Sequence, residues 1–320
     1  MSGSNVVRKS TGIAALLGLG VLGLSLLTGC EGTGGWFDKT DAVTSGGGGE
    51  DKVATKKMFR MDKPLAYADA ARQYNRSVDY LDRVQARANI LLTYFDEDGK
   101  ERHEDPEGRL QIVRPNKLAL SLGKAGQVLF WFGCDPEQYW WLDLSEKGKR
   151  IAAIGKHEKF DDSTAQRIGL PIKPLDLIRL LGVVKFDVTA RGATQWSDDG
   201  KLLGITAPVA DRGFQRTWVD PRDMHPVTIE IFNRQREPVL IAEHTGEEFV
   251  ELTRDLPGVG VTQVRMPGRV EITHLQTKTK ARITLTGVKD GPISEKAFDL
   301  SVILDKYPVD RTIDLDKKKQ

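Results

Sequence analysis

The 320-residue sequence predicts an α+β fold that is mostly β, built as one antiparallel β-rich body. Three observations lead to this prediction. About ten short runs of branched-aliphatic and aromatic residues recur along the chain. Turn-forming clusters such as Ser197-Asp198-Asp199-Gly200 separate these runs. Apolar residues at helical spacing are confined to two or three places. We find neither an internal repeat nor a linker to a second domain.

The first 29 residues have the layout of a secretory signal peptide. Arg8 and Lys9 precede an uncharged apolar run over 11–27, which leads into Leu27-Thr28-Gly29-Cys30. This ending is typical of a bacterial lipobox, so we expect cleavage before Cys30 and acylation of its thiol with palmitate-type chains. A membrane-spanning helix is the alternative. The run is short for a span, and its glycines weaken a helix.

Acylation would fix the location of the mature protein. Two or three acyl chains anchor a protein firmly, since each buried methylene contributes roughly 0.8 kcal/mol. We therefore expect a lipid-anchored protein in the cell envelope of a Gram-negative-type bacterium. Glu31, where sorting systems read an aspartate as an inner-membrane signal, favours the outer membrane facing the periplasm. The Gly-rich residues 30–57 form a flexible tether, and residues 58–320 form the folded domain.

Composition excludes some partners. Removing residues 1–29 takes away two basic residues and no acids, so the mature chain has 45 of each and is formally neutral. The positive balance of the precursor is therefore no sign of a nucleic-acid partner, and we expect none. Besides Cys30 only Cys134 is present, so an acylated chain has no intrachain disulfide.

The chain then predicts its elements in order. An apolar stripe at helical spacing from Tyr67 to Leu81 predicts a helix running from Asp62 to about Arg87. Strands are expected at 90–95 and over 109–122, where Pro115 would mark a bulge or edge. Residues 127–132 and 138–144 should form a hairpin, and 174–181 a short helix ended by Gly182. The remaining predicted strands are 202–207, 215–219, 227–233, 239–244, 270–274, 281–288 and 302–304.

A search for reaction chemistry nominates no catalytic residue, no metal ligand and no cofactor. The sequence has no nucleophile elbow, phosphate loop or metalloprotease helix, and its five histidines lack metal-ligand spacing. The acids and histidine of residues 220–225 fit a metal site less simply than a hairpin turn. What stands out is the density of large apolar side chains over 129–142. Such residues on both faces of a sheet need two covers, which makes an apolar cavity a candidate beside a plain core.

In the middle of the chain, the run from Gly108 to Asn116 ends in Arg114-Pro115-Asn116, and Gly126-Gln127-Val128-Leu129-Phe130-Trp131-Phe132 follows, then Asp135-Pro136. These motifs resemble the LolA/LolB lipoprotein-carrier superfamily. Residues 218–220, 226–227 and 295–299 are similar to that family's closing hairpins and end motif. The resemblance spans about residues 62–300, and its specific part is 108–136.

The resemblance implies a half-open β-barrel: a single curved antiparallel sheet with helices packed in or over its concave face, binding an acyl-chain ligand or lipoprotein. Arg114, with Pro115 and Asn116, would hold the helical lid. The candidate cavity-lining residues are Leu118, Leu120, Leu122, Leu129, Trp131, Trp141, Ile229 and Ile231. The chain departs from the family in having extra material around 145–215, whose role stays open.

These observations favour a membrane-anchored lipid- or lipoprotein-binding protein that performs no covalent chemistry. The alternative is a tethered structural lipoprotein of the envelope, with a filled barrel and a protein partner. An enzyme is disfavoured because no nucleophile and base are paired. The cargo and the direction of transfer are not encoded in any motif.

Overall fold

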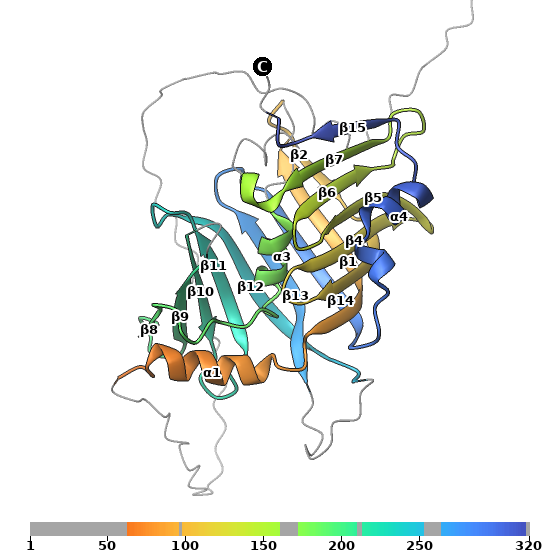
Figure 1. Ribbon diagram of the computed structural model, residues 1–320. Helices are drawn as coiled ribbons and strands as arrows, with labels where there is room; N and C mark the ends of the chain where they lie inside the picture. Colours follow the sequence, from red (N-terminus) through yellow and green to blue (C-terminus); the bar gives the residue numbers. More distant parts are fainter. Residues whose placement is uncertain (1–62, 96–97, 161–171, 210–212, 253–263, 318–320) are drawn as a thin grey trace, which may run out of the picture. The chain divides into compact units, whose positions relative to one another are not determined.

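One β-sheet runs through almost the whole folded chain (Figure 1). The computed structural model describes residues 63–95, 98–160, 172–209, 213–252 and 264–317. Cys30, the predicted signal peptide and the predicted tether lie outside these residues. The strands follow one another across the sheet in the order β15-β7-β6-β5-β4-β3-β1-β14-β13-β12-β11-β10-β9-β8, with β2 paired to β1. Most neighbours are antiparallel, and β15 pairs with β7 in parallel.

The strand bounds are as follows: β1 Arg83–Phe95, β2 Glu101–Glu104, β3 Glu107–Val113, β4 Lys117–Lys124, β5 Gln127–Cys134, β6 Gln138–Asp143, β7 Ile151–Lys156, β8 Ala193–Trp196, β9 Leu203–Pro208, β10 Phe214–Val219, β11 Pro226–Phe232, β12 Pro238–Phe249, β13 Arg265–His274, β14 Lys280–Lys289 and β15 Arg311–Asp314. The helices are α1 Tyr67–Ser77, η2 His157–Lys159, α3 Pro174–Leu180, η3 Glu295–Phe298 and α4 Leu300–Lys306.

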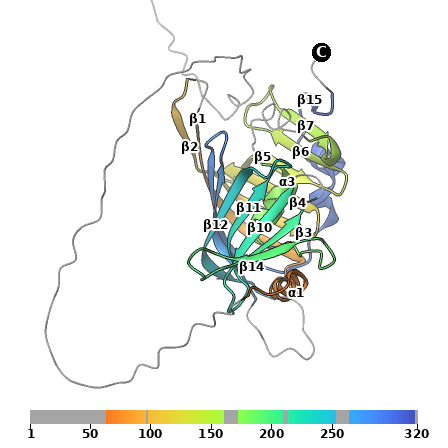
Figure 2. The same cartoon turned by 90° about the vertical axis from the view of Figure 1, so that its left-hand side faces the viewer.

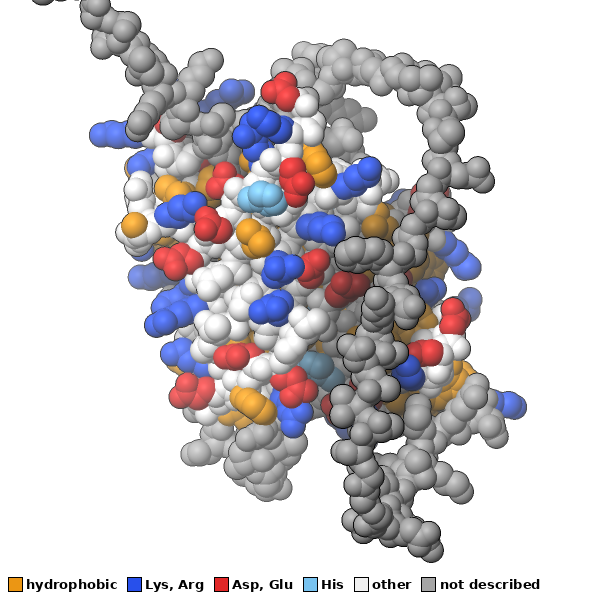
Figure 3. All heavy atoms as spheres, turned by 180° about the vertical axis from the view of Figure 1, so that it is seen from behind, with side chains coloured by type: hydrophobic (Ala, Val, Ile, Leu, Met, Phe, Trp, Pro, Cys, Tyr) orange, Lys and Arg blue, Asp and Glu red, His pale blue; other side chains and the backbone are white. Residues whose placement is uncertain are grey.

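Alternating side chains give the sheet one apolar and one polar face. Along β14, Ala281, Ile283 and Leu285 are buried, while the residues between them face outward. Across the outer face, Arg282 pairs with Glu271 of β13 at 2.9 Å. Figure 3 shows Lys and Arg interleaved with Asp and Glu over this side of the molecule. The core therefore lies on the inner side of the sheet.

The sheet curves around α3. This helix contacts β4 and β5 on one arm and β11 on the other, although β3, β1, β14, β13 and β12 separate β4 from β11 in the sheet. In Figure 1, α3 lies between the arm of β8–β12 and the arm of β4–β7. The sheet stays open because β15 and β8 are its two ends. The prediction of a mostly β fold with one curved antiparallel sheet and helices on its concave face is confirmed.

The other helices cover an end and the outside of the sheet. α1 contacts β8 and β9 and lies below the arm of β9–β12 (Figure 2). On the outer face of β5–β7, Leu300 and Ile303 of α4 form a second, smaller core with Trp140 and Leu142. Among the described residues, every helix is too short or too polar to cross a bilayer.

Three predicted elements are wrong in extent or type. The N-terminal helix ends at Ser77 and not near Arg87, because the apolar spacing changes to a period of two from Val84, within β1. Pro115 lies in the turn that joins β3 to β4 and not in a strand bulge. Residues 302–304 are helical because the Asp299 carboxylate caps α4, accepting hydrogen bonds from the backbone N–H groups of residues 301 and 302.

The segment around 145–215 belongs to the main fold. It contributes β7, α3, β8 and β9, of which β7 and β8 were not predicted. The predicted hairpin of β5 and β6 is confirmed, with Phe132 opposite Trp141. The predicted short helix is confirmed as α3, which begins at Pro174 and ends just before Gly182.

Candidate functional site

The candidate site is the apolar wall on the concave face of the sheet. Leu118, Leu120 and Leu122 of β4 and Ile229 and Ile231 of β11 are all buried in one hydrophobic cluster. Leu129 and Trp141 are partly buried against the same cluster. The structure therefore brings together all of the predicted cavity-lining residues except Trp131.

Trp131 lies on the opposite face of the sheet. Its ring packs against Tyr307, with 5.6 Å between ring centroids, in the small core under α4. The neighbours Phe130 and Phe132 face the wall instead, as alternation along β5 requires. Trp131 therefore does not line the predicted wall. The alternation of side chains along β5 in the sequence already indicates this, because Phe130 and Phe132 take the opposite face.

Aromatic rings that the sequence reasoning did not nominate complete one side of the wall. The ring of Trp141 stacks on Phe130 at 5.3 Å and meets Phe132 edge-on at 5.9 Å, measured between centroids. Such aromatic pairs contribute about 0.5–1.5 kcal/mol beyond simple burial. The β5–β6 arm therefore lines the wall with packed aromatic rings, in contrast to the aliphatic β11 side.

Helix α3 fills the centre of the concave space. Its side chains Leu177, Ile178 and Leu180, with the following Leu181, are each at most 4% exposed. Pro174 suits the first turn of the helix, and Gly182 ends it with a positive φ of 73°. The chain thus covers the centre of its own apolar wall with α3, while Ala70, Ala71 and Tyr74 of α1 add to the same cluster at one end.

Arg114 ties both helices to the sheet. Its guanidinium donates to the carbonyl oxygens of Val183 and Asp79, each at 3.0 Å. Val183 follows α3 and Asp79 follows α1, so one side chain holds both helix ends at the β3–β4 turn. Pro115 and Asn116 belong to the same turn, and the Asn116 carbonyl accepts from the Cys134 thiol at 3.3 Å.

A second set of hydrogen bonds joins α1 directly to the segment that follows α3. The Tyr74 hydroxyl donates to the Gly182 carbonyl at 2.8 Å, and burial raises the pKa of this hydroxyl. Asn75 exchanges two hydrogen bonds with the backbone of Phe186, at 2.7 and 2.8 Å. Asp79 forms an ion pair with Lys185. We call residues 182–187 with their partners on α1 and Arg114 the clasp.

His244 of β12 contacts α3 from the wall. Its Nε2 lies 2.6 Å from the Leu180 carbonyl oxygen, and its Nδ1 lies 3.2 Å from that of Pro226. Burial lowers the pKa of His244 to about 4, although both carbonyl contacts act in the opposite direction. A neutral imidazole has one N–H, so at neutral pH only one of the two carbonyls receives a hydrogen bond.

The structure also places the other residues that the sequence search considered for reaction chemistry. Within the described ranges, no group of three or more His, Cys, Asp or Glu residues is placed to hold a metal ion. Residues 220–225 form the turn between β10 and β11, where Asp220 binds Arg222. Burial raises the pKa of the Cys134 thiol, which disfavours the reactive thiolate.

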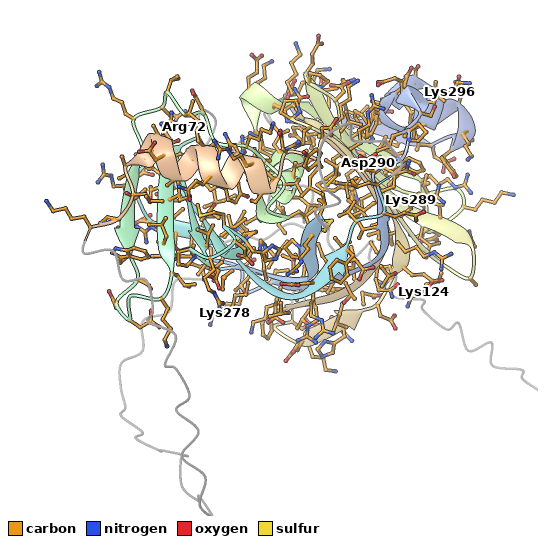
Figure 4. The ribbon with its side chains drawn as sticks, turned by 90° about the horizontal axis from the view of Figure 1, so that it is seen from below. Arg72, Lys124, Lys278, Lys289, Asp290 and Lys296 are labelled. Atoms are coloured by element: carbon orange, nitrogen blue, oxygen red, sulfur yellow. The ribbon has the colours of Figure 1, made fainter. Side chains whose placement is uncertain are left out.

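A groove of about 530 Å³ also lies on the outer side of the sheet, beside β1 and β14. An ion pair between Lys124 and Asp105, 2.8 Å apart, forms part of its wall. Figure 4 shows Lys124 far from Arg72 of α1, which marks the helix-covered end. This groove is separate from the concave wall.

Similar proteins are found by structure and not by sequence. No family model and no curated protein matches the sequence. An outer membrane lipoprotein-sorting protein domain from Vibrio parahaemolyticus is similar at a TM-score of 0.50 and 10% identity, covering 74% of this chain and 97% of that one. A LolA superfamily protein from Nitrosomonas europaea gives 0.46 at 12% identity, covering 73% and 98%. A DUF1329 family protein from Desulfovibrio piger gives 0.43 at 11% identity, covering 73% and 96%. At 10% identity, the similarity to the Vibrio parahaemolyticus domain establishes the fold alone.

Proposed function

We propose that this protein is a lipid-anchored protein of the cell envelope of a Gram-negative-type bacterium, which binds acyl chains of lipids or lipoproteins on its concave face. Acylated Cys30 would hold it at the outer membrane, facing the periplasm. The observation that carries the proposal is the continuous apolar wall from β4 to β11, covered at its centre by one short helix. The LolA-like fold supports it, because the similar domain from Vibrio parahaemolyticus is described as lipoprotein-sorting.

An acyl chain would bind by replacing α3 on the wall, without covalent chemistry. Leu177, Ile178 and Leu180 of α3 occupy the space that an acyl chain would need, so loading requires α3 to leave. The clasp lies after α3 in the chain, and it would keep the helix close while the wall is loaded. Arg114, as the residue that holds both helix ends, would set the closed position. The acyl chain would then pass to whichever partner removes more of its apolar surface from water.

A structural role is the second candidate, and the filled wall favours it. If α3 never leaves, the protein is a tethered scaffold whose partners bind elsewhere. Such a protein would be anchored in the same way but would carry no lipid. The two candidates therefore differ in whether an acyl chain reaches the concave face.

Photo-crosslinking of the full-length protein in cells separates the two candidates. Cells are fed a diazirine-bearing fatty acid and irradiated, and adducts on the purified protein are mapped by mass spectrometry. We expect adducts on β4, β5 and β11. Trp141→Ala should reduce them several-fold, whereas Trp131→Ala, which removes an equal ring from the other face, should not. Adducts absent from all three strands would overturn the binding role and favour the scaffold.

The anchor has its own test. Wild-type protein should incorporate alkyne-palmitate, whereas Cys30→Ser should not. Equal labelling of the two proteins would refute lipidation at Cys30.

A further inference from the structure

The concave wall contains a buried polar pair on β10 that has spare hydrogen-bond donors. Gln215 and Thr217 of β10 are 5% and 0% exposed. The Gln215 side-chain amide donates to the Thr217 hydroxyl at 3.0 Å. Throughout the described part of the chain, this is the only hydrogen bond that either side chain makes.

The surroundings of this pair are otherwise apolar. Across the two ladders that flank β10, Gln215 lies opposite Ala207 and Ile231. Thr217 lies opposite Ile205 and Ile229, two fully buried residues of the concave cluster. The pair therefore belongs to the apolar wall.

Buried polar groups in proteins are nearly always hydrogen-bonded, because leaving one without a partner costs about 1–3 kcal/mol. A Gln side chain has two donor hydrogens and an acceptor oxygen, and a Thr hydroxyl both donates and accepts. One shared hydrogen bond leaves one Gln215 amide hydrogen and the Thr217 hydroxyl hydrogen without an acceptor among the described residues. By comparison, the buried side chains Asp143 and His244 each make two contacts, Asp143 with Ser145 and His244 with two backbone carbonyls.

The same place lacks charge. Arg216, between the two polar residues, points to the opposite face, where it pairs with Glu230 at 3.4 Å. The residues opposite Gln215 and Thr217 are all aliphatic. Burying a carboxylate here without a cation would cost far more than burying a neutral carbonyl. The spot therefore suits an uncharged polar group attached to a hydrocarbon chain.

We propose that Gln215 and Thr217 bind the ester or amide carbonyl of an acyl chain seated on the concave wall. The pair selects esterified or amide-linked acyl chains over free fatty acids. This inference rests on the proposed function and assigns the chemical class of its ligand. Both a glycerolipid ester and an N-acylated lipoprotein supply this carbonyl.

The test uses displacement of the hydrocarbon dye diphenylhexatriene from the full-length chain, with Cys30→Ser in every variant so that the protein carries no acyl chain of its own. The competitors are methyl palmitate, N-methylpalmitamide, palmitate and hexadecane. The key variant is Gln215→Leu with Thr217→Val. Replacing both hydrogen-bonded partners by apolar groups of similar shape is nearly neutral for folding. Thr228→Val, on the outer face of β11, is the matched control.

We expect the double variant to lose about tenfold in affinity for the ester and the amide, the equivalent of one neutral hydrogen bond, and nothing for hexadecane or the dye. Thr228→Val should match the parent. If the double variant loses more affinity for the ester, a glycerolipid is the better ligand. If it loses more affinity for the amide, an N-acyl group is the better ligand. Equal losses for carbonyl ligands and hexadecane, or no loss at all, would overturn the inference. A parent chain that binds neither dye nor lipid would instead refute the proposed function.

Discussion

The free energy of unfolding of the His244→Gln variant should fall less than that of the wild type as the pH is lowered. The unfolded chain binds a proton at this imidazole near pH 6.5, whereas the folded protein binds it only near pH 4. Between these values the unfolded state binds more protons, so acid favours unfolding and stability falls as the pH falls. At about 1.4 kcal/mol per pH unit, the full difference corresponds to about 3 kcal/mol. His244→Gln keeps a donor for the Leu180 carbonyl and removes the titration.

Urea unfolding followed by tryptophan fluorescence from pH 7.5 to 4 measures this effect. We expect the free energy of unfolding of the wild type to fall by about 3 kcal/mol more than that of His244→Gln over this range. Burial also lowers the pKa of the nearby His225, but that contribution remains in both proteins. His103→Gln, at an exposed position, should follow the wild type. Parallel pH profiles for the wild type and His244→Gln would refute the reasoning.

Two further substitutions test the clasp by the same unfolding assay. Arg114→Met should lower the free energy of unfolding by about 2 kcal/mol, because two charge-assisted hydrogen bonds to backbone carbonyls disappear. Arg109→Met, at an exposed position of β3, should change it by less than about 0.5 kcal/mol, and equal losses would contradict the assignment. Gly182→Ala should destabilise by at least about 1 kcal/mol more than Gly99→Ala. Both glycines have φ near +72°, but only at Gly182 would the new methyl group lie 2.8 Å from Pro226. Equal losses of stability would show that Pro226 can move away from the methyl group at no cost.

The parts of the fold that could be read from the sequence are those set by local rules. Pro174 and Gly182 delimit α3, and the alternation around the β5–β6 turn defines that hairpin. The sequence does not reveal the end of α1, because Val78 and Leu81 continue the helical stripe although both lie beyond the helix. Both residues are buried, so the stripe correctly identified core residues but not the conformation that buries them.

The parts of the site that the sequence did not reveal depend on contacts between distant segments. His244 meets the Leu180 carbonyl across 64 positions of the chain, and no local pattern reports such a pairing. Gln215 and Thr217 look like ordinary polar strand residues until their alternation is placed on the concave side. Trp131 is the opposite case, because alternation along β5 was readable but the density of neighbouring aromatic residues suggested a shared wall.

The filled wall is energetically compatible with a carrier as well as with a scaffold. Four buried side chains of α3 and the following residue stabilise the closed form by roughly 6–12 kcal/mol, at about 1.5–3 kcal/mol each. A saturated chain of about 16 carbons gains about 12 kcal/mol on burial, at about 0.8 kcal/mol per methylene. The two figures meet at about 12 kcal/mol, so the exchange would be near balance where the helix side chains contribute at the upper end of their range. In the proposed carrier, the clasp would stay formed while α3 is displaced, because it spans Gly182 to Asp187 and not α3 itself, and it would then return the helix to the empty wall. A near-balanced exchange of this kind is what reversible loading and release require, since a much stronger cover would exclude the ligand and a much weaker one would leave the apolar wall exposed to water.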